Sequence, residues 1–168
     1  RRAIPPVGLM HRYERVKRVG KGSFGAAVLA KRRSDALMCV VKTVDLRRLS
    51  RREAKLVRQE ATLLATLRHP HIVAHLETFA AEQTLCIVME YCERGDLEQW
   101  VRRRKAARRK ATEERASGLF AQLCLALEHV HAHRVVHRDV KCSNAFLTAV
   151  CREGDASSNE AVPSRLKL

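Results

Sequence analysis

The chain changes character near residue 95, and this change constrains the fold more than any other feature. Before this point, short apolar segments rich in β-branched residues are separated by turn residues, as in antiparallel strands: 13–19, 26–30, 37–44, 72–79 and 85–89. Apolar residues at helical spacing predict helices over 46–67, 96–103 and 113–133. The sequence therefore predicts an α+β fold with a strand-rich first half and a helical second half.

The same pattern divides the chain into regions. Residues 1–12 form an irregular lead-in, 13–90 the strand-rich region, and 91–95 a joint that ends at Gly95. The helical region is expected over 96–168. Within it, residues 149–163 are polar and read as a loop.

A glycine-rich segment, Gly20-Lys21-Gly22-Ser23-Phe24-Gly25, has the form G-x-G-x-x-G. Glycines let backbone amides approach phosphate oxygens closely. A dinucleotide-binding fold needs a helix after such a turn, whereas strand-like residues lie on both sides here. The segment therefore indicates a hairpin folded over phosphates, and a plain hairpin turn is the alternative.

Lys42 ends the apolar run Cys39-Val40-Val41. The charge of a lysine on a mostly apolar strand needs a partner when it is buried. Glu60, on the predicted helix 46–67, is a reasonable partner. The alternative is an edge-strand lysine that faces solvent.

The octet His137-Arg138-Asp139-Val140-Lys141-Cys142-Ser143-Asn144 carries the most specific chemistry. A carboxylate can orient a hydroxyl and accept its proton, an ammonium can neutralise phosphate charge, and an amide oxygen can bind Mg²⁺. Asp139, Lys141 and Asn144 have these three functional groups within six residues. The pattern predicts phosphoryl transfer.

These features occur in the order and spacing of eukaryotic protein kinases: the glycine segment, Lys42, Glu60, the segment Ile87-Val88-Met89-Glu90-Tyr91-Cys92 and the octet. The chain resembles this family over residues 13–148, and 164–168 are expected to belong to it as well. Lys141 is typical of serine/threonine kinases. Two finer segments, 90–97 and 144–148, resemble the NIMA-related kinase family.

The resemblance implies a two-lobed fold. A complete N-lobe, with an antiparallel sheet and one main helix, would span 13–90, and a hinge would span 91–95. The first part of a helical C-lobe would follow over 96–168. ATP with Mg²⁺ is then expected in the cleft between the lobes.

The resemblance also implies roles for single residues. Gly20, Lys21, Gly22, Ser23 and Gly25 would cover the phosphates, and Lys42 would hold the α- and β-phosphates while it pairs with Glu60. The adenine pocket would consist of Val28 and Val40 against the ring, Met89 at its back, the backbone of Glu90 and Cys92 along its edge, and Phe146 as its floor. In the octet, Asp139 would be the catalytic base, Lys141 would steady the γ-phosphate, and Asn144 would bind Mg²⁺.

The sequence departs from the kinase pattern near its end. The pattern requires Asp-Phe-Gly after a short strand, and 165–168 look like that strand, but the Asp-Phe-Gly is not in the 168 residues. Without the Mg²⁺-binding aspartate, we expect these residues alone to transfer phosphate poorly. The loop at 149–163 is also longer than the turn usual there.

The resulting prediction is an ATP-dependent serine/threonine protein kinase acting on protein hydroxyls. The alternative is a short form or pseudokinase that binds nucleotide or a partner without phosphoryl transfer. An intracellular location, cytoplasmic or nuclear, is expected, since no secretory leader is visible and the cysteines have no zinc or disulfide spacing. No apolar run approaches the ~20 residues of a membrane helix.

The net charge of +15 favours polyanionic partners. Seven Lys or Arg lie within 102–110. A solvated surface near the substrate entrance is the preferred interpretation, with acidic protein partners as an expectation. A nuclear import signal and a nucleic-acid site are the alternatives, and the second is disfavoured because no aromatic residue interleaves with the run. Metal binding by the histidines at 69, 71, 75 or at 129, 131, 133 is not expected.

Overall fold

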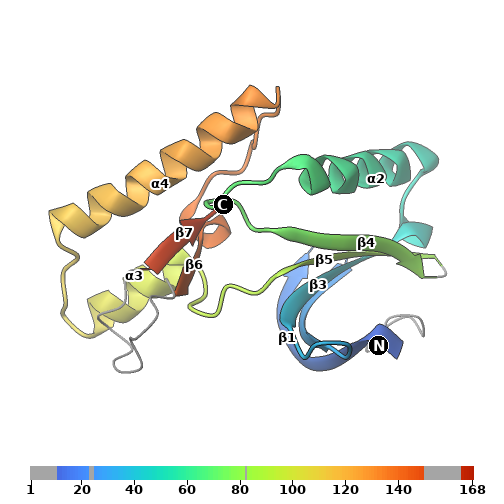
Figure 1. Cartoon of the computed structure of the whole chain (residues 1–168), viewed down its shortest axis with the longest axis horizontal. Coiled ribbons are helices and arrows are strands. Elements are labelled where there is room, and N and C mark those ends of the chain that lie inside the picture. Colours follow the sequence, from blue (N-terminus) through green and yellow to red (C-terminus); the bar gives the residue numbers. More distant parts are fainter. Residues whose placement is uncertain (1–10, 23–24, 82, 150–163) are drawn as a thin grey trace. The chain divides into compact units, whose positions relative to one another are not determined.

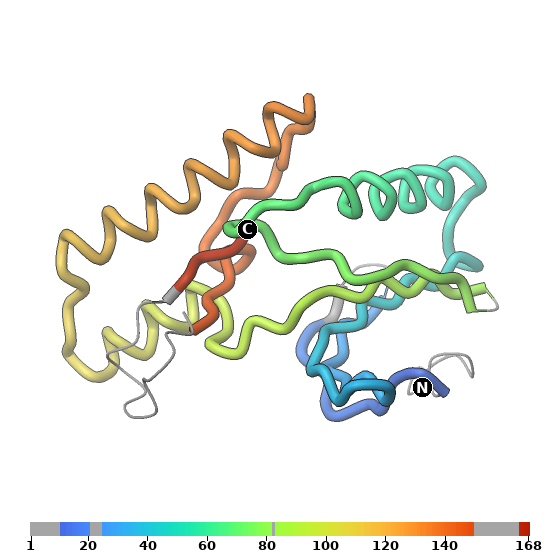
Figure 2. The backbone as a smooth tube through the Cα atoms, viewed as in Figure 1, coloured from blue at the N-terminus to red at the C-terminus, as the bar shows by residue number. Residues whose placement is uncertain are grey.

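A computed structural model describes residues 11–22, 25–81, 83–149 and 164–168. The chain forms two compact units: unit 1 comprises Arg1–Thr66 and Ala74–Tyr91, and unit 2 comprises Leu67–Val73 and Cys92–Leu168. Figure 2 traces the chain through both. The predicted α+β class is confirmed. Ser23 of the glycine segment and residues 150–163 of the expected loop lie outside the described residues.

Unit 1 is a five-stranded antiparallel sheet with one α-helix, α2 (Arg51–Thr66). In spatial order the strands are β1 (Tyr13–Gly22), β2 (Gly25–Arg32), β3 (Met38–Asp45), β5 (Thr84–Glu90) and β4 (His75–Ala81). Figure 1 shows α2 running along one face of this sheet. All five strands that the apolar pattern predicts are therefore present, and the fourth begins three residues later than expected.

Each face of the sheet has its own apolar cluster, because successive side chains of a strand point to opposite faces. One cluster contains Tyr13, Val28, Ala30, Cys39, Val41, Cys86 and Val88. The other contains Val44, Leu46, Leu85 and Ile87 together with Ala61 of α2, and Ala54, Val57 and Met89 pack at its edge. Helix α2 therefore covers the face that carries Val40, Lys42 and Val44 of β3.

The expected helix over 46–67 is wrong at its start. A 3₁₀ turn, η1 (Leu46–Arg48), comes first, and the Asp45 carboxylate caps it by accepting from the Arg47 N–H at 3.1 Å. A new start follows at Ser50, whose N–H donates to Glu53 (2.8 Å) while its hydroxyl accepts from the Glu53 N–H (3.2 Å). This reciprocal pair is a capping box, so two capping signals divide the segment.

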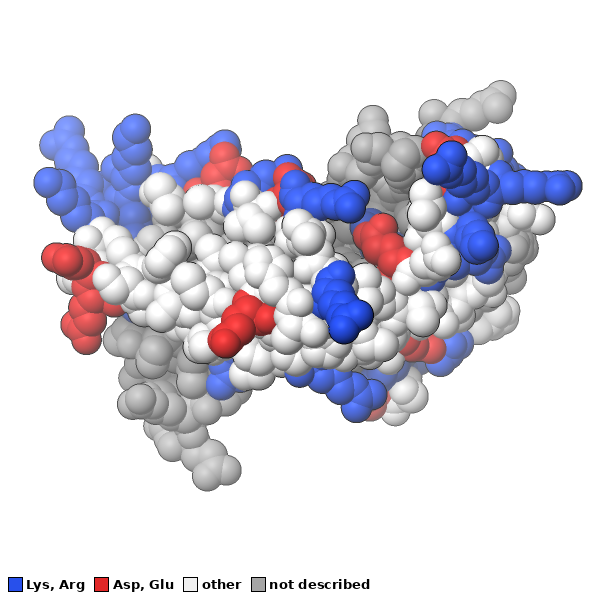
Figure 3. Space-filling view, turned by 90° about the horizontal axis from the view of Figure 1, so that it is seen from above, with Lys and Arg blue, Asp and Glu red and all other residues white. Residues whose placement is uncertain are grey.

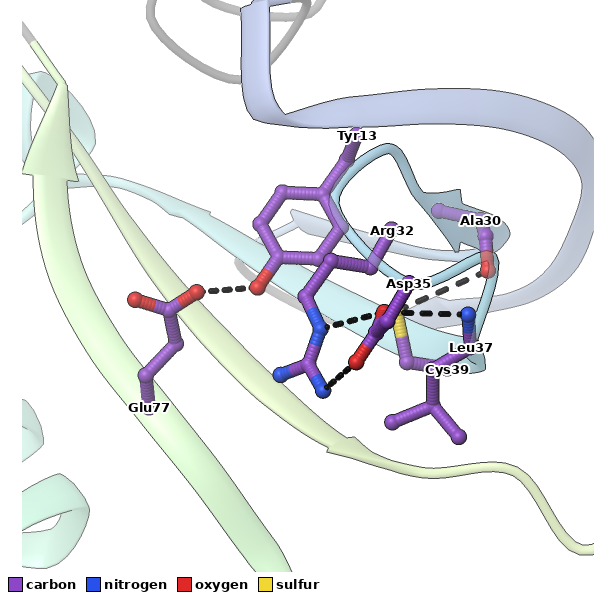
Figure 4. A network of polar contacts seen from close by, with 7 residues as sticks. All are labelled: Tyr13, Ala30, Arg32, Asp35, Leu37, Cys39 and Glu77. Atoms are coloured by element: carbon purple, nitrogen blue, oxygen red, sulfur yellow. Dashed lines mark hydrogen bonds and ion pairs between the residues drawn. The ribbon is translucent and has the colours of Figure 1, made fainter.

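Polar contacts link β1 to β4 and stabilise the turn between β2 and β3 (Figure 4). The Tyr13 hydroxyl donates to the Glu77 carboxylate of β4. Burial and this carboxylate raise the pKa of Tyr13 to about 12, so the phenol stays protonated. In the β2–β3 turn, Arg32 Nε donates to Asp35 at 2.9 Å, and Asp35 accepts from the Leu37 N–H at 3.1 Å.

Unit 2 contains helices α3 (Leu97–Ala106) and α4 (Glu113–Ala132), the 3₁₀ turn η2 (Cys142–Asn144) and the hairpin of β6 (Phe146–Ala149) and β7 (Ser164–Lys167). Its core joins Leu119 of α4 to Ala145, Leu147 and Leu166, with Leu97 and Trp100 of α3 packed against them. The strand expected at 165–168 is therefore present. It is held by the Gln122 side chain, which accepts from the Leu166 N–H at 2.7 Å.

Helix α4 buries one face and exposes part of its apolar surface. Leu119, Ala126 and Val130 are buried, at spacings of seven and four residues. Phe120, although apolar, is 66% exposed. The physical reason is that Phe120 is one residue from Leu119, about 100° around the helix. No helix in the described part of the chain is long and apolar enough to cross a membrane.

Four histidine rings form a cluster where the segment Leu67–Val73 meets α4. The ring centroid of His69 lies 5.5 Å from that of His71 and 5.0 Å from that of His129, and His129 lies 4.5 Å from His133. The Nε2 atom of His129 is buried without a hydrogen-bond partner among the described residues. Burial, then the neighbouring His129 and His71, lower the pKa of His69, while Glu128 opposes the shift.

This histidine cluster predicts a loss of stability in mild acid. The His69 pKa in the folded state lies below its unfolded value near 6.5, so below about pH 6.5 the unfolded chain binds more protons and the free energy of unfolding falls. The slope is at most about 1.4 kcal/mol per pH unit for one histidine. Urea unfolding at pH 7.5 and 5.5 should show this loss in wild type and a smaller one in His69→Asn. The matched control is His131→Asn, since His131 is exposed on α4 and takes no part in these ring contacts. An equal pH effect in both variants would contradict the assignment.

Candidate active site

The octet forms a compact polar loop between α4 and β6. The Lys141 ammonium lies 2.9 Å from the Asp139 carboxylate. The Asn144 side-chain Nδ2 donates to both the carbonyl and the carboxylate of Asp139, each at 2.8 Å. The structure therefore brings together the three residues that the sequence predicted to carry the chemistry.

These contacts set the protonation state of the loop. The Lys141 contact, followed by the Asn144 hydrogen bond, lowers the pKa of Asp139, so its carboxylate is ionised at neutral pH. The Asp139 and Lys141 side chains are 61% and 53% exposed. An ionised, accessible carboxylate can accept a hydrogen bond from a substrate hydroxyl and orient its oxygen.

The backbone that presents Asp139 is constrained on both sides. Arg138 has φ +64°, a left-handed conformation that non-glycine residues rarely adopt and that occurs often at functional sites. After the loop, Asn144 N–H donates to the Lys141 carbonyl at 3.0 Å, and the Ala145 carbonyl accepts from Leu97 N–H at 2.8 Å. The loop is therefore anchored to the start of α3.

Asn144 fits its expected metal role. Its Nδ2 is engaged by Asp139, which fixes the amide orientation and leaves Oδ1 as the atom for a cation. Amide and carboxylate oxygens are the ligands that Mg²⁺ prefers. The described residues contain no cluster of three or more His, Cys, Asp or Glu that could hold a metal ion, so metal binding at this loop would rely on oxygens of the nucleotide as well.

The joint at 91–95 is tied to β6. Gly95 has φ +76°, its N–H donates to the Cys92 carbonyl (3.2 Å), and its carbonyl accepts from Leu147 N–H (2.8 Å). Nearby, the Glu90 N–H donates to the Ala74 carbonyl at 2.9 Å. Phe146, the expected pocket floor, is half-buried at the start of β6.

In unit 1 the glycine segment is a β-hairpin, as its pattern predicted. Gly20, Lys21 and Gly22 end β1, and Gly25 begins β2; Lys21 pairs with Ala26 and Gly22 with Gly25. This strand–turn–strand arrangement is that of a kinase glycine loop and differs from the strand–turn–helix of a dinucleotide-binding fold.

The expected role of Val28 needs correction. In the β2–β3 register Val28 lies opposite Val41, whereas Ala27 lies opposite Lys42 and Leu29 opposite Val40. Residues directly opposite share a face, so Val28 is on the face away from Lys42, where it is buried with Tyr13 and Cys39. Ala27 and Leu29 share the face of Lys42. The sequence alone does not give this register, because it depends on how β2 pairs with β3.

Lys42 and Met89 lie on one face of the sheet, as the alternation requires. Lys42 is opposite Ile87 of β5, and Val40 is opposite Met89. Met89 is half-buried and packs at the edge of the cluster beneath α2. A ligand bound on this face of the sheet could therefore contact both residues.

The expected ion pair between Lys42 and Glu60 is not formed. Between the residues that the structure describes, no ion pair joins them, and both side chains are exposed. Helix α2 is anchored on the sheet through Ala54, Val57 and Ala61, and this leaves Glu60 outside the buried stripe. The expected pairing of Lys42 with Glu60 therefore stays a prediction for another arrangement of α2.

Gly25 permits a close approach of β2 to β3. A Cβ atom built at Gly25 would lie 1.6 Å from the Thr43 carbonyl oxygen, and this atom belongs to a backbone that cannot turn away. We expect Gly25→Ala to lower the free energy of unfolding by about 3 kcal/mol or to displace the glycine hairpin. Gly118→Ala in α4 is the matched control, because nothing lies within 4 Å of its Cβ position; it should stabilise by about 0.5–1 kcal/mol. Urea unfolding of both variants measures the difference, and equal effects would contradict the close approach.

Comparison with known proteins agrees with this geometry. The protein kinase domain family matches residues 13–153. The chain is 42% identical over 139 residues to the serine/threonine-protein kinase Nek1 of Mus musculus, which covers 83% of this chain and 11% of that protein. It is 37% identical over 162 residues to Nek5 of Homo sapiens, covering 95% of this chain and 23% of that protein. The putative serine/threonine-protein kinase A of Trypanosoma brucei brucei is 38% identical over 132 residues, which cover 78% of this chain and 31% of that protein.

The chain thus spans less than a third of the length of these relatives. The matched residues include the glycine hairpin, Lys42, Glu60 and the whole octet. The chain belongs to the protein kinase family, and its domain is of the NIMA-related type.

Proposed function

We propose that the protein transfers the γ-phosphoryl group of MgATP to serine or threonine hydroxyls of protein substrates, inside the cell in the cytoplasm or nucleus. The observation that carries this proposal is the Asp139–Lys141–Asn144 constellation, with its 2.8–2.9 Å contacts. Membership in a family of named serine/threonine kinases supports the reaction type.

Asp139 would accept the hydrogen bond of the substrate hydroxyl and then its proton. The hydroxyl oxygen forms a bond to the γ-phosphorus as the bond from that phosphorus to the bridging oxygen breaks, and ADP leaves. Lys141, already beside Asp139, would balance charge on the phosphoryl oxygens. Magnesium bound with the nucleotide supplies further neutralisation of phosphate charge.

The residues of unit 1 would bind the nucleotide. The backbone of Gly20, Gly22 and Gly25 would cover the phosphates, and Lys42 would contact the α- and β-phosphates. The adenine would meet Val40 and Met89, which lie on the Lys42 face, with Ala27 and Leu29 in place of Val28. Ser23 and Lys21 keep their proposed place in the phosphate loop.

Phosphorylation of a peptide array by protein expressed from its natural transcript tests the proposal. The array presents Ser, Thr or Tyr in otherwise identical sequences. We expect phosphate on Ser and Thr peptides and none above background on Tyr peptides. Transfer to Tyr alone, or no transfer while ATP binds, would overturn it.

A nucleotide-binding or partner-binding module without phosphoryl transfer is a second candidate. Lys42 and Glu60 favour it, because both are exposed and no ion pair joins them among the described residues. A lobe that holds this arrangement permanently would not complete the active site. Saturable ATP binding together with absent transfer would support this candidate.

A further inference from the structure

The basic run, residues 102–110, forms a structured corner of unit 2. It contains seven cations: Arg102, Arg103, Arg104, Lys105, Arg108, Arg109 and Lys110. The first four lie on the last turns of α3, and the others lie in the turn that leads towards α4. Figure 3 shows Lys and Arg side chains gathered at the left of the view, where Figure 1 places this turn.

The turn has a defined backbone. Arg108 N–H donates to the Lys105 carbonyl at 3.1 Å, and Arg109 N–H donates to the Arg104 carbonyl at 2.9 Å. This pair of bonds is a Schellman motif, whose left-handed position is usually glycine. Here it is Arg108, with φ +53°, which is unfavourable for an arginine. The Arg104 guanidinium also donates to the Lys110 carbonyl at 2.7 Å, so the backbone that carries these cations has a defined conformation.

Positive charge is concentrated at this corner, and several of the cations lie close together. The guanidinium carbons of Arg104 and Arg115 lie 5.0 and 5.7 Å from the Trp100 ring centroid. Burial lowers the pKa of Arg115, and repulsion from Arg104 and Arg94 adds to the shift. Arg102 of the basic run pairs with Glu98 at 2.7 Å. A bound anion would relieve this repulsion.

The basic run is also fixed relative to the octet. The start of α3 packs against η2, and Leu97 and Trp100 pack on the core that contains Ala145. The ten residues of α3 span roughly 15 Å, a distance that an extended peptide covers in about five residues. A few more residues cover the step from Asp139 to the start of α3.

We propose that the basic run docks an Asp- or Glu-rich segment of the protein substrate, about five to eight residues from the phosphorylated hydroxyl. The proposal rests on the proposed function. A polypeptide is favoured over nucleic acid because the basic run contains no aromatic residue and the Trp100 ring is covered by guanidinium groups, so bases have no ring to stack on.

The test compares two substrate peptides and two charge variants. Both peptides share one Ser acceptor and a neutral six-residue spacer, followed by four Glu in one and four Gln in the other. The docking variant is Lys105→Gln/Arg108→Gln/Lys110→Gln. The matched control, Arg51→Gln/Lys55→Gln/Arg58→Gln on α2, removes the same charge from exposed positions of unit 1.

For wild type at low salt, we expect kcat/KM to be about tenfold higher with the Glu peptide than with the Gln peptide. The difference should come from a lower KM, with kcat unchanged. The docking variant should lose most of this preference, and the control variant should keep it. Equal kcat/KM for the two peptides, or equal losses in both variants, would overturn the proposal.

A binding measurement separates this proposal from the proposed function. Fluorescence anisotropy of a labelled Glu peptide without the Ser acceptor reports docking even if no phosphate is transferred. We expect its binding to weaken about tenfold in the docking variant. Duplex DNA serves as competitor, and tighter binding of DNA than of the Glu peptide would assign the basic run to nucleic acid and overturn the proposal.

Discussion

Replacing Asp139 by asparagine is expected to lower kcat by about 10²- to 10⁴-fold, the range for loss of a positioned acid or base. The substitution keeps the size of the side chain and its hydrogen bonding with Asn144. It removes the negative charge that holds Lys141 at 2.9 Å and the only carboxylate of the octet. Single-turnover phosphoryl transfer measures the effect, and ATP affinity should change little because Asp139 would contact the hydroxyl substrate.

Asp35→Asn is the control for this change. Asp35 is an exposed carboxylate that accepts from Arg32 in a turn of unit 1, so its loss should leave kcat within about twofold. A kcat for Asp139→Asn above a tenth of the wild-type value would contradict the assignment of Asp139 as the base. Because the pKa of Asp139 is lowered, its titration should not change kcat between pH 5 and 8.

The octet could be predicted because its chemistry is local. Asp139, Lys141 and Asn144 lie within six residues, so any loop that closes them brings their side chains together, as the 2.8–2.9 Å contacts confirm. The strands were predictable for a similar reason. Their β-branched runs and turns carry the signal in single segments, and errors of up to three residues occur at their ends.

Features that depend on packing between segments were not predictable in the same way. The face of Val28 depends on the pairing of β2 with β3, and an offset of one residue reverses it. The break before α2 depends on two competing caps, at Asp45 and Ser50. The histidine cluster joins segments sixty residues apart, and no local pattern indicates it.

Lys42 provides the second large effect. Lys42→Met is expected to lower kcat/KM by about 10²- to 10³-fold, because the methionine leaves phosphate charge without its fixed counter-ion. The free energy of unfolding should stay within about 0.5 kcal/mol of wild type, since the Lys42 side chain is exposed and forms no ion pair with a described residue. Steady-state kinetics and urea unfolding measure the two quantities. Lys31→Met, at an exposed position of β2, is the matched control and should change neither.

Glu60→Gln then decides whether Lys42 and Glu60 work as a pair. If α2 moves so that Glu60 meets Lys42 in the active form, the single variants and the double variant should all lose activity to a similar extent, since residues that act as a unit are not additive. If Glu60→Gln keeps full activity while Lys42→Met loses it, the exposed, unpaired arrangement is itself the working one. Strictly additive losses would mean that the two residues act separately, and would likewise contradict the pair.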